Sequence, residues 1–453
     1  MSERLSPPAP RPPVNLAPSS WPRVAYLAFY FPPTRASGVH RSLATANHLA
    51  GAGWDVTALT PQREFFRDAI RSYDPSLDAR VRADVRVDRV PFRSPAWETD
   101  IRRFSRFRGN FPLAHRVVST RLERTLFPEP YARWIAPVVR RLLSLHRVTP
   151  FDVVLATGNP FSSFAAAWSF HRLTGVPYVL DYRDSWTLDL FTDEAVAEPG
   201  SAAYRWESRV LSGAARAFFV NSALLEWHAG RYPSAAPRMR VVQNGYEPDA
   251  VRVVERGRLP GNGLRFGYVG TITPHVPVEA LVDGWLLARS KEPALGDARV
   301  DLYGHLGFFP AAVEATRSRL PDPSTSAVNY RGPVRKADLA RVYGSLDALL
   351  LVLGGGRYVT SGKVFEYMAT GRPVVSVHRA DSAAAEVLSG YPLWFPAADL
   401  SAPAVAAALS RAAHAASVLT DDQVGAARDH ARTYTRTAQL EVLERELCEV
   451  ARG

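Results

Sequence analysis

A short segment in the second half of the sequence, SGKVFEYMATGRPVV at residues 361–375, places one lysine and one glutamate in a short helix. Free backbone N–H groups at a helix N-terminus favour an anion, and a lysine adds a full positive charge. The turn therefore suits a phosphate, with contributions from Thr360, Ser361, Gly362 and Lys363. Glu366 would repel that phosphate, but its carboxylate suits a ribose diol. The two charges would then hold adjoining parts of a nucleotide sugar.

The same residues also fit an ordinary helix start. Ser361 is a suitable N-cap, and the helix dipole favours a glutamate such as Glu366 in the first turn. First-turn glutamates are common. The segment alone therefore leaves capping and nucleotide binding as alternatives, and the surrounding elements have to be considered.

The surrounding pattern alternates apolar strands with helices, twice over. Strands are expected in the first half at 23–31, 54–61, 151–158, 176–182, 215–222 and 238–245, and in the second half at 264–271, 298–304, 327–332, 347–353 and 372–377. Strand–helix–strand units of this kind form parallel sheets. We therefore predict an α/β protein with two Rossmann-like domains facing each other across a cleft. Such sheets bind ligands at the carboxyl ends of their strands, which suits an activated donor and a separate acceptor.

Changes in composition mark the domain boundaries. Residues 1–21 are rich in Pro and Ser, lack the apolar core of a signal peptide, and predict a disordered lead. The first domain is expected at 22–247 and the second at 248–430, with a polar connection at 246–263. A final helix within 431–453 is expected to pack back on the first domain.

The composition also excludes several classes of protein. No apolar run approaches the ~18 residues that span a bilayer, so no transmembrane helix is expected. The single cysteine, Cys448, excludes an internal disulfide framework and a cysteine-based metal site. The net charge of +11 suggests a partner with negative charge. Together these features predict a cytoplasmic enzyme.

A second group of polar residues follows the strands of the first domain. The segment DYRDSW comes after the buried run VPYVL and carries Asp181, Arg183 and Asp184. A carboxylate at this strand end could orient or deprotonate an acceptor hydroxyl, and the arginine could hold it or contact a phosphate. The alternative is a structural Asp–Arg pair at the domain surface. Asn159 occupies a similar strand end and could bind sugar hydroxyls.

The 361–373 segment closely resembles the S-K-x-x-E-Y-x-A-x-G-x-P signature of glycosyltransferases with the GT-B fold, in the large retaining family 4. Further stretches match in the expected order, at 29–41, 151–163, 176–186, 241–249 and 264–273, so that the resemblance covers about residues 22 to 450. It implies transfer of a sugar from a UDP- or GDP-linked donor to an acceptor held by the first domain, with no other cofactor. Cell-surface polysaccharide or glycolipid synthesis would be a suitable setting.

The resemblance also implies roles for single residues. The loop containing Gly38 would approach the donor diphosphate and the acceptor, and Gly270 would lie at the donor site. Arg35 and His40 could face the cleft from that loop, although His40 fits a helix surface equally well. The DYRDSW segment would line the reaction centre. No D-x-D triplet is present in the sequence, so no metal is expected.

Two departures from the family pattern concern the donor sugar. Many members carry a glutamate eight residues before the helix glutamate, where this sequence has Tyr358. Many also carry an arginine and a lysine after Gly270, and the sequence VGTITPHVPVEAL has neither. These departures leave more of the phosphate binding to Lys363 and to backbone amides.

Residues 101–147 form a basic insertion with eleven arginines, two acidic residues and interleaved aromatic side chains. A basic, aromatic segment can lie on an anionic membrane surface, here at the inner face of the membrane, or bind a phosphate-bearing or lipid-linked acceptor. The alternative is an ordinary helix that is buried on the sheet and has a solvated arginine face. Nucleic acid is not expected, because no nucleic-acid motif accompanies the charge.

The sequence thus predicts a metal-independent, retaining glycosyltransferase. Retention without a clear nucleophile implies front-face transfer, in which the leaving diphosphate helps to take up the acceptor proton. The alternatives are a nucleotide-sugar 2-epimerase and a non-catalytic, glycosyltransferase-like binding protein. The donor sugar, the base and the acceptor are left open.

Overall fold

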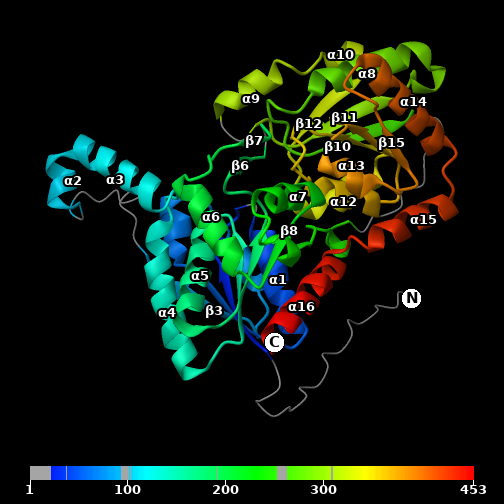
Figure 1. Cartoon of the computed structure of the whole chain (residues 1–453). Helices are drawn as coiled ribbons and strands as arrows, with labels where there is room; N and C mark the ends of the chain where they lie inside the picture. The colour runs from blue at the N-terminus through cyan, green and yellow to red at the C-terminus, as the bar shows by residue number, and fades with distance from the viewer. Residues whose placement is uncertain are drawn as a thin grey trace, which may run out of the picture.

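The computed structural model describes residues 22–36, 38–92, 102, 104–190, 192–251, 263–307 and 310–453. The expected lead at 1–21 lies outside these residues, as do most of the connection at 246–263 and residues 101 and 103 of the basic insertion. The described chain forms two α/β domains, each built on one parallel sheet (Figure 1). This confirms the predicted fold class of two Rossmann-like domains.

The first domain contains a seven-stranded sheet of order β3-β2-β1-β4-β5-β8-β9, in which every neighbouring pair is parallel. Its strands are β1 Arg23–Ala28, β2 Asp55–Pro61, β3 Arg86–Val90, β4 Val153–Gly158, β5 Tyr178–Tyr182, β8 Arg216–Phe219 and β9 Met239–Val241. The edge strand β3 was not predicted, because most of its residues are polar. A short antiparallel pair, β6 Leu188–Asp189 and β7 Glu194–Ala195, follows β5.

Helices cover both faces of this sheet, because successive strand residues point to opposite faces and both sets are apolar. In β1, Ala25 and Leu27 belong to one buried cluster, while Val24 and Tyr26 belong to the other. The helices of the domain body are α1 Val39–Gly51, α4 Ile135–Val148, α5 Ser162–Thr174, α6 Ala202–Gly213 and α7 Ser222–Arg231.

The basic insertion divides into two parts. Its second part, ending in α4, is buried on the sheet through Trp134, Val138 and Leu142, which is the ordinary alternative for this stretch. Its first part forms α2 Arg106–Asn110 and α3 Pro112–Leu126, which extend away from the domain body (Figure 1). Among the side chains that the structure describes in this α2–α3 arm, five large apolar ones are exposed: Phe107, Phe111, Leu113, Val117 and Val118.

The second domain contains a six-stranded parallel sheet of order β12-β11-β10-β13-β14-β15. Its strands are β10 Arg265–Val269, β11 Arg299–Tyr303, β12 Val328–Gly332, β13 Ala348–Val352, β14 Val374–Val377 and β15 Trp394–Pro396. Its helices are α8 Val278–Lys291, α9 Pro310–Arg317, α10 Pro323–Ser326, α11 Leu339–Gly344, α12 Gly362–Ala369, α13 Ala383–Leu388, α14 Ala402–Ser417 and α15 Asp421–Arg432. Among the helices that the structure describes, none has both the length and the apolar character needed to cross a bilayer.

The chain passes between the domains twice, and the two passages are hydrogen-bonded to each other at a place that we call the hinge. Here the N–H of Tyr246 donates to the carbonyl of Tyr434 at 3.0 Å, and the N–H of Arg436 donates to the carbonyl of Tyr246 at 2.8 Å. The last helix, α16 Arg436–Arg452, then packs against α1 of the first domain (Figure 1). There Nε2 of His48, on α1, lies 2.9 Å from Oε2 of Glu444, on α16.

Candidate active site

A cavity of about 230 Å³ lies in the second domain, where β10 and β13 end and α12 begins. Its lining includes Gly270, Gly354, Ser361 and Lys363. The glycine at position 354 allows close packing, because a Cβ there would lie only 1.6 Å from the carbonyl oxygen of His275. Three of the predicted donor-binding residues, Gly270, Ser361 and Lys363, are therefore brought together at the carboxyl edge of this sheet, where parallel sheets bind ligands.

The start of α12 is capped as expected. The Ser361 hydroxyl accepts a hydrogen bond from the N–H of Lys363 at 3.3 Å, and Gly362 is the first helical residue. Glu366 is the fifth residue of the helix and lies beyond its first turn, so the expected first-turn placement of Glu366 is wrong. The carboxylate is thus one turn away from the capped N-terminus, which leaves the N-terminal amides to an anion.

Lys363 and Glu366 form an ion pair with each other, with 2.8 Å between Nζ and Oε2. The hydroxyl of Tyr343, on α11, donates to the same Oε2 at 2.6 Å. The lysine and glutamate side chains are 27% and 24% exposed, so a ligand in the cleft can reach them. Within the part of the chain that the structure describes, Oε1 of Glu366 has no hydrogen-bond partner, which leaves one carboxylate oxygen for a ligand.

Tyr343 was missed by the sequence analysis, because nothing local marks α11 as a neighbour of α12. Burial, and then the charge of Glu366, raise the pKa of Tyr343 far above its ordinary value. The phenol therefore stays protonated at any physiological pH and remains a donor that fixes the orientation of Glu366.

Asp181, on β5, is fully buried, and both of its carboxylate oxygens are occupied. Arg41 of α1 donates to them through Nε at 2.9 Å and Nη2 at 2.7 Å, and Thr157 adds a hydrogen bond at 3.3 Å. Arg41 also donates to the carbonyls of Val242 and Gln243. Both oxygens of Asp181 are therefore engaged within the protein, as in the alternative of a structural Asp–Arg pair, and the catalytic role of Asp181 stays a prediction. Its arginine partner is Arg41, however, rather than the neighbouring Arg183.

Arg183 joins the ends of three elements in the first domain. Its guanidinium donates to the carbonyls of Gly158 and Asn159 at the end of β4, at 3.1 and 3.2 Å. It also lies against the start of α1, where a Cβ at Gly38 would be 2.2 Å from Nη1. A side chain at position 38 would therefore have to displace the Arg183 guanidinium from this position. Oδ2 of Asp184 lies 3.8 Å from Nη2 of Arg183, and the Asp184 side chain is exposed. Arg183 and Asp184 come after the end of β5, whereas Asp181 lies within this strand.

Comparison with known proteins identifies the family. A model described as a glycosyl transferase 4-like domain matches residues 37–245, and one described as glycosyl transferases group 1 matches residues 263–414. The chain belongs to the group 1 glycosyltransferases. The two matched segments coincide with the two domains of this glycosyltransferase. No curated protein sequence matches it.

Solved structures confirm the GT-B fold of this glycosyltransferase. A sucrose-phosphate synthase from Thermosynechococcus elongatus matches over 94% of this chain and 99% of its own, with a TM-score of 0.64 and 15% identity. A glycosyltransferase from Rickettsia africae matches over 95% and 99%, with a TM-score of 0.65 and 12% identity. HepE from Anabaena, solved in complex with UDP, matches over 94% and 100%, with a TM-score of 0.60 and 12% identity.

The remaining predicted donor residue, Thr360, faces the first domain of the glycosyltransferase. Its Oγ1 accepts a hydrogen bond from the Asn221 amide at 3.1 Å, and the same amide donates to the carbonyl of Tyr358 at 2.8 Å. Tyr358, at the position where many family members carry a glutamate, packs against the core cluster of the first domain. This stretch of the loop therefore connects the domains, and Thr360 does not line the second-domain cavity.

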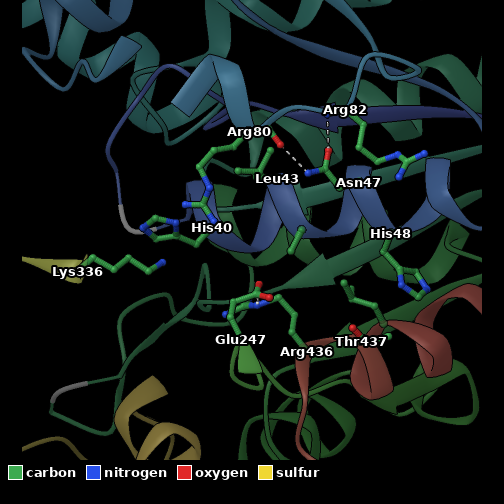
Figure 2. A pocket seen from close by; sticks show the side chains of 12 residues that line it. His40, Leu43, Asn47, His48, Arg80, Arg82, Glu247, Lys336, Arg436 and Thr437 are labelled. Carbon is green, nitrogen blue, oxygen red and sulfur yellow. Dashed lines mark hydrogen bonds and ion pairs between the residues drawn. The ribbon is translucent and has the colours of Figure 1, made fainter. Parts of the chain in front are cut away.

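The two remaining acceptor candidates, Arg35 and His40, lie just before and at the start of α1. Arg35 is exposed in the loop after β1. His40, on the first turn of α1, lines a different cavity near the hinge, which Figure 2 shows. Burial, followed by the positive charges of Lys336 and Arg80, lowers the pKa of His40 to about 4, while Glu366 opposes this shift. The imidazole is therefore neutral at pH 7, and the electrostatic effect of Glu366 reaches this helix.

Proposed function

We propose that this glycosyltransferase moves a sugar from a UDP- or GDP-linked donor to an acceptor held by the first domain, with retention and without a metal ion. The observation that carries this proposal is the second-domain cavity, where Gly270, Ser361 and Lys363 meet beside the partly exposed Glu366. The published complex of HepE with UDP-glucose, a structural neighbour, supports a nucleotide-sugar donor.

Each group of the cavity has a distinct task in this reaction. The amides at the start of α12 and the ammonium of Lys363 stabilise the negative charge that builds up on the departing diphosphate. Binding of the donor exchanges the Lys363–Glu366 ion pair for contacts with phosphate and ribose. Glu366, held by Tyr343, accepts hydrogen bonds from the ribose hydroxyls through Oε1. The protein thus mainly positions the substrates and compensates charge.

The first domain supplies the groups around the acceptor. Arg183 and Asp184 lie past the carboxyl end of β5, beside Gly38 and the end of β4. We assign the acceptor contacts to Asp184 and to the exposed Asn159 side chain, with Arg183 available to a phosphate oxygen. Asp181 holds α1 in place through Arg41 and acts as a positioning residue.

The acceptor is a membrane-associated molecule in this proposal, because the α2–α3 arm suits an anionic lipid surface. Its exposed apolar residues include Phe111 and Leu113, the latter 72% exposed. The arm also carries Arg106, Arg108 and Arg116. Apolar side chains flanked by arginines can insert into the headgroup region while the cations contact anionic lipids.

Two experiments test these assignments. A screen of nucleotide sugars, with and without acceptor, that measures released nucleotide identifies donor and base together. Isomerised nucleotide sugar without any acceptor would instead establish the 2-epimerase, and tight binding without release in every mixture would establish a binding protein.

Vesicle flotation tests the arm. Phe111→Ser with Leu113→Ser should reduce recovery with anionic vesicles, whereas Leu173→Ser, which removes an exposed leucine from α5, should not. Recovery of the wild type should also fall with salt, since screening acts over about 8 Å at physiological ionic strength. Equal recovery with neutral and anionic vesicles would contradict the membrane assignment.

A further inference from the structure

A second cavity, of about 390 Å³, lies at the hinge on the outer face of α1 (Figure 2). Its lining residues are His40, Leu43, Ala44, Asn47, His48, Arg80, Arg82, Glu247, Lys336, Arg436, Thr437 and Leu440. None of them lines the second-domain cavity, so this hinge pocket is a separate site. Its volume lies within the usual range of roughly 300–1,000 Å³ for small-molecule sites.

The hinge pocket is built from both domains. Lys336 comes from the loop after β12 of the second domain, and Figure 2 shows its side chain reaching toward α1 of the first. Glu247 and Arg436 come from the two chain passages between the domains. A ligand in this pocket would therefore contact both domains and both passages at once.

Positive charge prevails in the hinge pocket. Four cationic side chains, of Arg80, Arg82, Lys336 and Arg436, face one carboxylate, that of Glu247. That carboxylate is already paired with Nε of Arg436 at 2.7 Å. Arg82 is paired with Asp84, but in the residues that the structure describes the side chains of Arg80 and Lys336 form no ion pair. Glu247 and Glu366 act on Lys336 only through longer-range electrostatics, so two cations of the pocket have no direct ion-pair partner among the described residues.

The segment that carries Arg80 and Arg82 is held in place by Asn47 of α1. The Asn47 amide donates to the carbonyl of Arg80 at 2.8 Å, and its oxygen accepts from the N–H of Arg82 at 3.0 Å. Both arginines therefore start from a fixed backbone. Burial, followed by the charge of Arg80, lowers the pKa of Lys336, while the carboxylates of Glu366 and Glu247 oppose this shift.

We propose that the hinge pocket binds a small phosphate-bearing anion and links the two domains through it. Lys336 and Arg80 provide the two charges that form no ion pair within the described part of the chain, and an ammonium and a guanidinium both bind phosphate oxygens well. Because Lys336 belongs to one domain and Arg80 to the other, a bound anion stabilises the domain arrangement seen here. The site goes beyond the proposed transfer reaction and gives the enzyme a place where a phosphorylated small molecule regulates it.

Calorimetric titration of the full chain with inorganic pyrophosphate tests this proposal. Lys336→Gln and Arg80→Gln should each weaken binding about tenfold or more, since each removes a hydrogen bond between charged groups. Arg335→Gln is the matched control, because it removes a charge from the same loop but from a side chain that does not line the pocket and that pairs with Asp338. Unchanged affinity in both Lys336→Gln and Arg80→Gln would overturn the proposal.

Lys363→Ala separates this site from the donor site, which also attracts pyrophosphate. Lys363→Ala should still bind pyrophosphate at the hinge pocket, which is the binding that Lys336→Gln weakens. If Lys363→Ala instead abolishes all binding, the hinge pocket is not an anion site and the proposal fails. The result is independent of sugar transfer, so it distinguishes failure of this site from failure of the proposed function.

His40 provides a second readout by proton NMR of its imidazole. Saturating pyrophosphate should raise the pKa of His40 from its low value, because a nearby anion favours the charged form. Lys363→Ala should show the same rise. An unchanged His40 titration at saturation would place the anion elsewhere and contradict the proposal.

Discussion

Two ion pairs of this glycosyltransferase, Arg41–Asp181 and Lys363–Glu366, are built in opposite ways. The first joins α1 to β5, with both side chains buried and both carboxylate oxygens occupied. The second lies within α12 at the cleft, about a quarter exposed on each side, with one carboxylate oxygen left open. Each combines a carboxylate with a cation near the carboxyl edge of a parallel sheet.

The difference shows what a charged pair at a sheet edge can do. A buried pair whose hydrogen bonds are all internal has nothing left for a ligand, and removing one partner leaves an uncompensated charge in the core. A partly exposed pair contributes little to stability, and each of its charges can exchange its partner for a substrate. The first pair therefore holds the fold, and the second is available for the donor.

The largest effect is expected for Asp181→Asn. The free energy of unfolding should fall by about 3–5 kcal/mol, because the charge of Arg41 stays buried without its carboxylate. Urea denaturation measures this change. Asp184→Asn, three residues away and exposed, is the matched control and should change stability by less than about 0.5 kcal/mol. If Asp181→Asn keeps its full stability but loses turnover, Asp181 has a catalytic role and this prediction is wrong.

Glu129 sharpens the comparison, because it is a buried carboxylate that pairs with no cation among the residues that the structure describes. Burial raises its pKa to about 7, although the N–H groups of Phe161 and Ser162 donate to it and oppose the shift. Because the folded pKa exceeds the unfolded value of about 4.3, the folded state holds the proton more tightly. Stability should therefore decline as pH rises from about 4.5 to 7.

Unfolding of the wild type and of Glu129→Gln across this pH range isolates the contribution. The wild type should lose more stability between pH 4.5 and 7 than the variant, which cannot ionise at this position. Parallel curves for the two proteins would show that Glu129 keeps an ordinary pKa.

Lys363→Ala tests the exposed pair. Nucleotide-sugar affinity should weaken by about 2–3 kcal/mol, because a hydrogen bond between charged groups is lost. The unfolding free energy should change by less than about 1 kcal/mol. Calorimetry on Lys363→Ala and on the control Lys291→Ala, at the exposed end of α8, measures the difference. Unchanged donor affinity in the folded variant would remove Lys363 from the site.

Glu366→Ala is expected to weaken donor binding by about 1.5 kcal/mol, since a single carboxylate oxygen is open to the ribose. A deoxyribose form of the nucleotide provides the control. The wild type should bind the deoxy form less tightly than the ribose form, while Glu366→Ala should bind both equally. A variant that still discriminates between the two sugars would show that the ribose lies elsewhere.

Tyr343→Phe should have the smallest effect, a loss of about 0.5–1 kcal/mol in donor affinity. The phenol does not touch the donor in this account but fixes Glu366 through one hydrogen bond. When Tyr343→Phe is combined with Glu366→Ala, it should cause no further loss of donor affinity. Additive losses in the double variant would give Tyr343 a separate contact with the donor.

Much of this architecture could be predicted from local sequence. Apolar runs alternating with helices predicted two parallel sheets, and the turn before Val364 predicted the capped start of α12. The burial of Asp181 could also have been predicted from local sequence, because the expected strand at 176–182 contains Asp181, whereas Arg183 and Asp184 follow that strand. A residue inside a strand of a doubly covered sheet is buried, and a residue after its end faces the cleft.

Other features could not be predicted because they depend on distant partners. Arg41 is 140 residues from Asp181 in the sequence. Thr360 has phosphate-binding chemistry by type, yet the approach of Asn221 from the other domain gives it a structural contact. The expected basic insertion likewise divides into a buried helix and an exposed arm only once the sheet is assembled.

Hydrogen–deuterium exchange with and without UDP tests the central contrast between the two pairs most directly. We expect slower amide exchange at 361–367 and around Gly270 when UDP binds, because these backbones surround the donor cavity. Amides of β5 around Asp181 should exchange equally slowly in both states, since Arg41 and Asp181 are already paired and buried without UDP. Protection confined to β5 and the start of α1, with unchanged exchange at 361–367, would contradict the account.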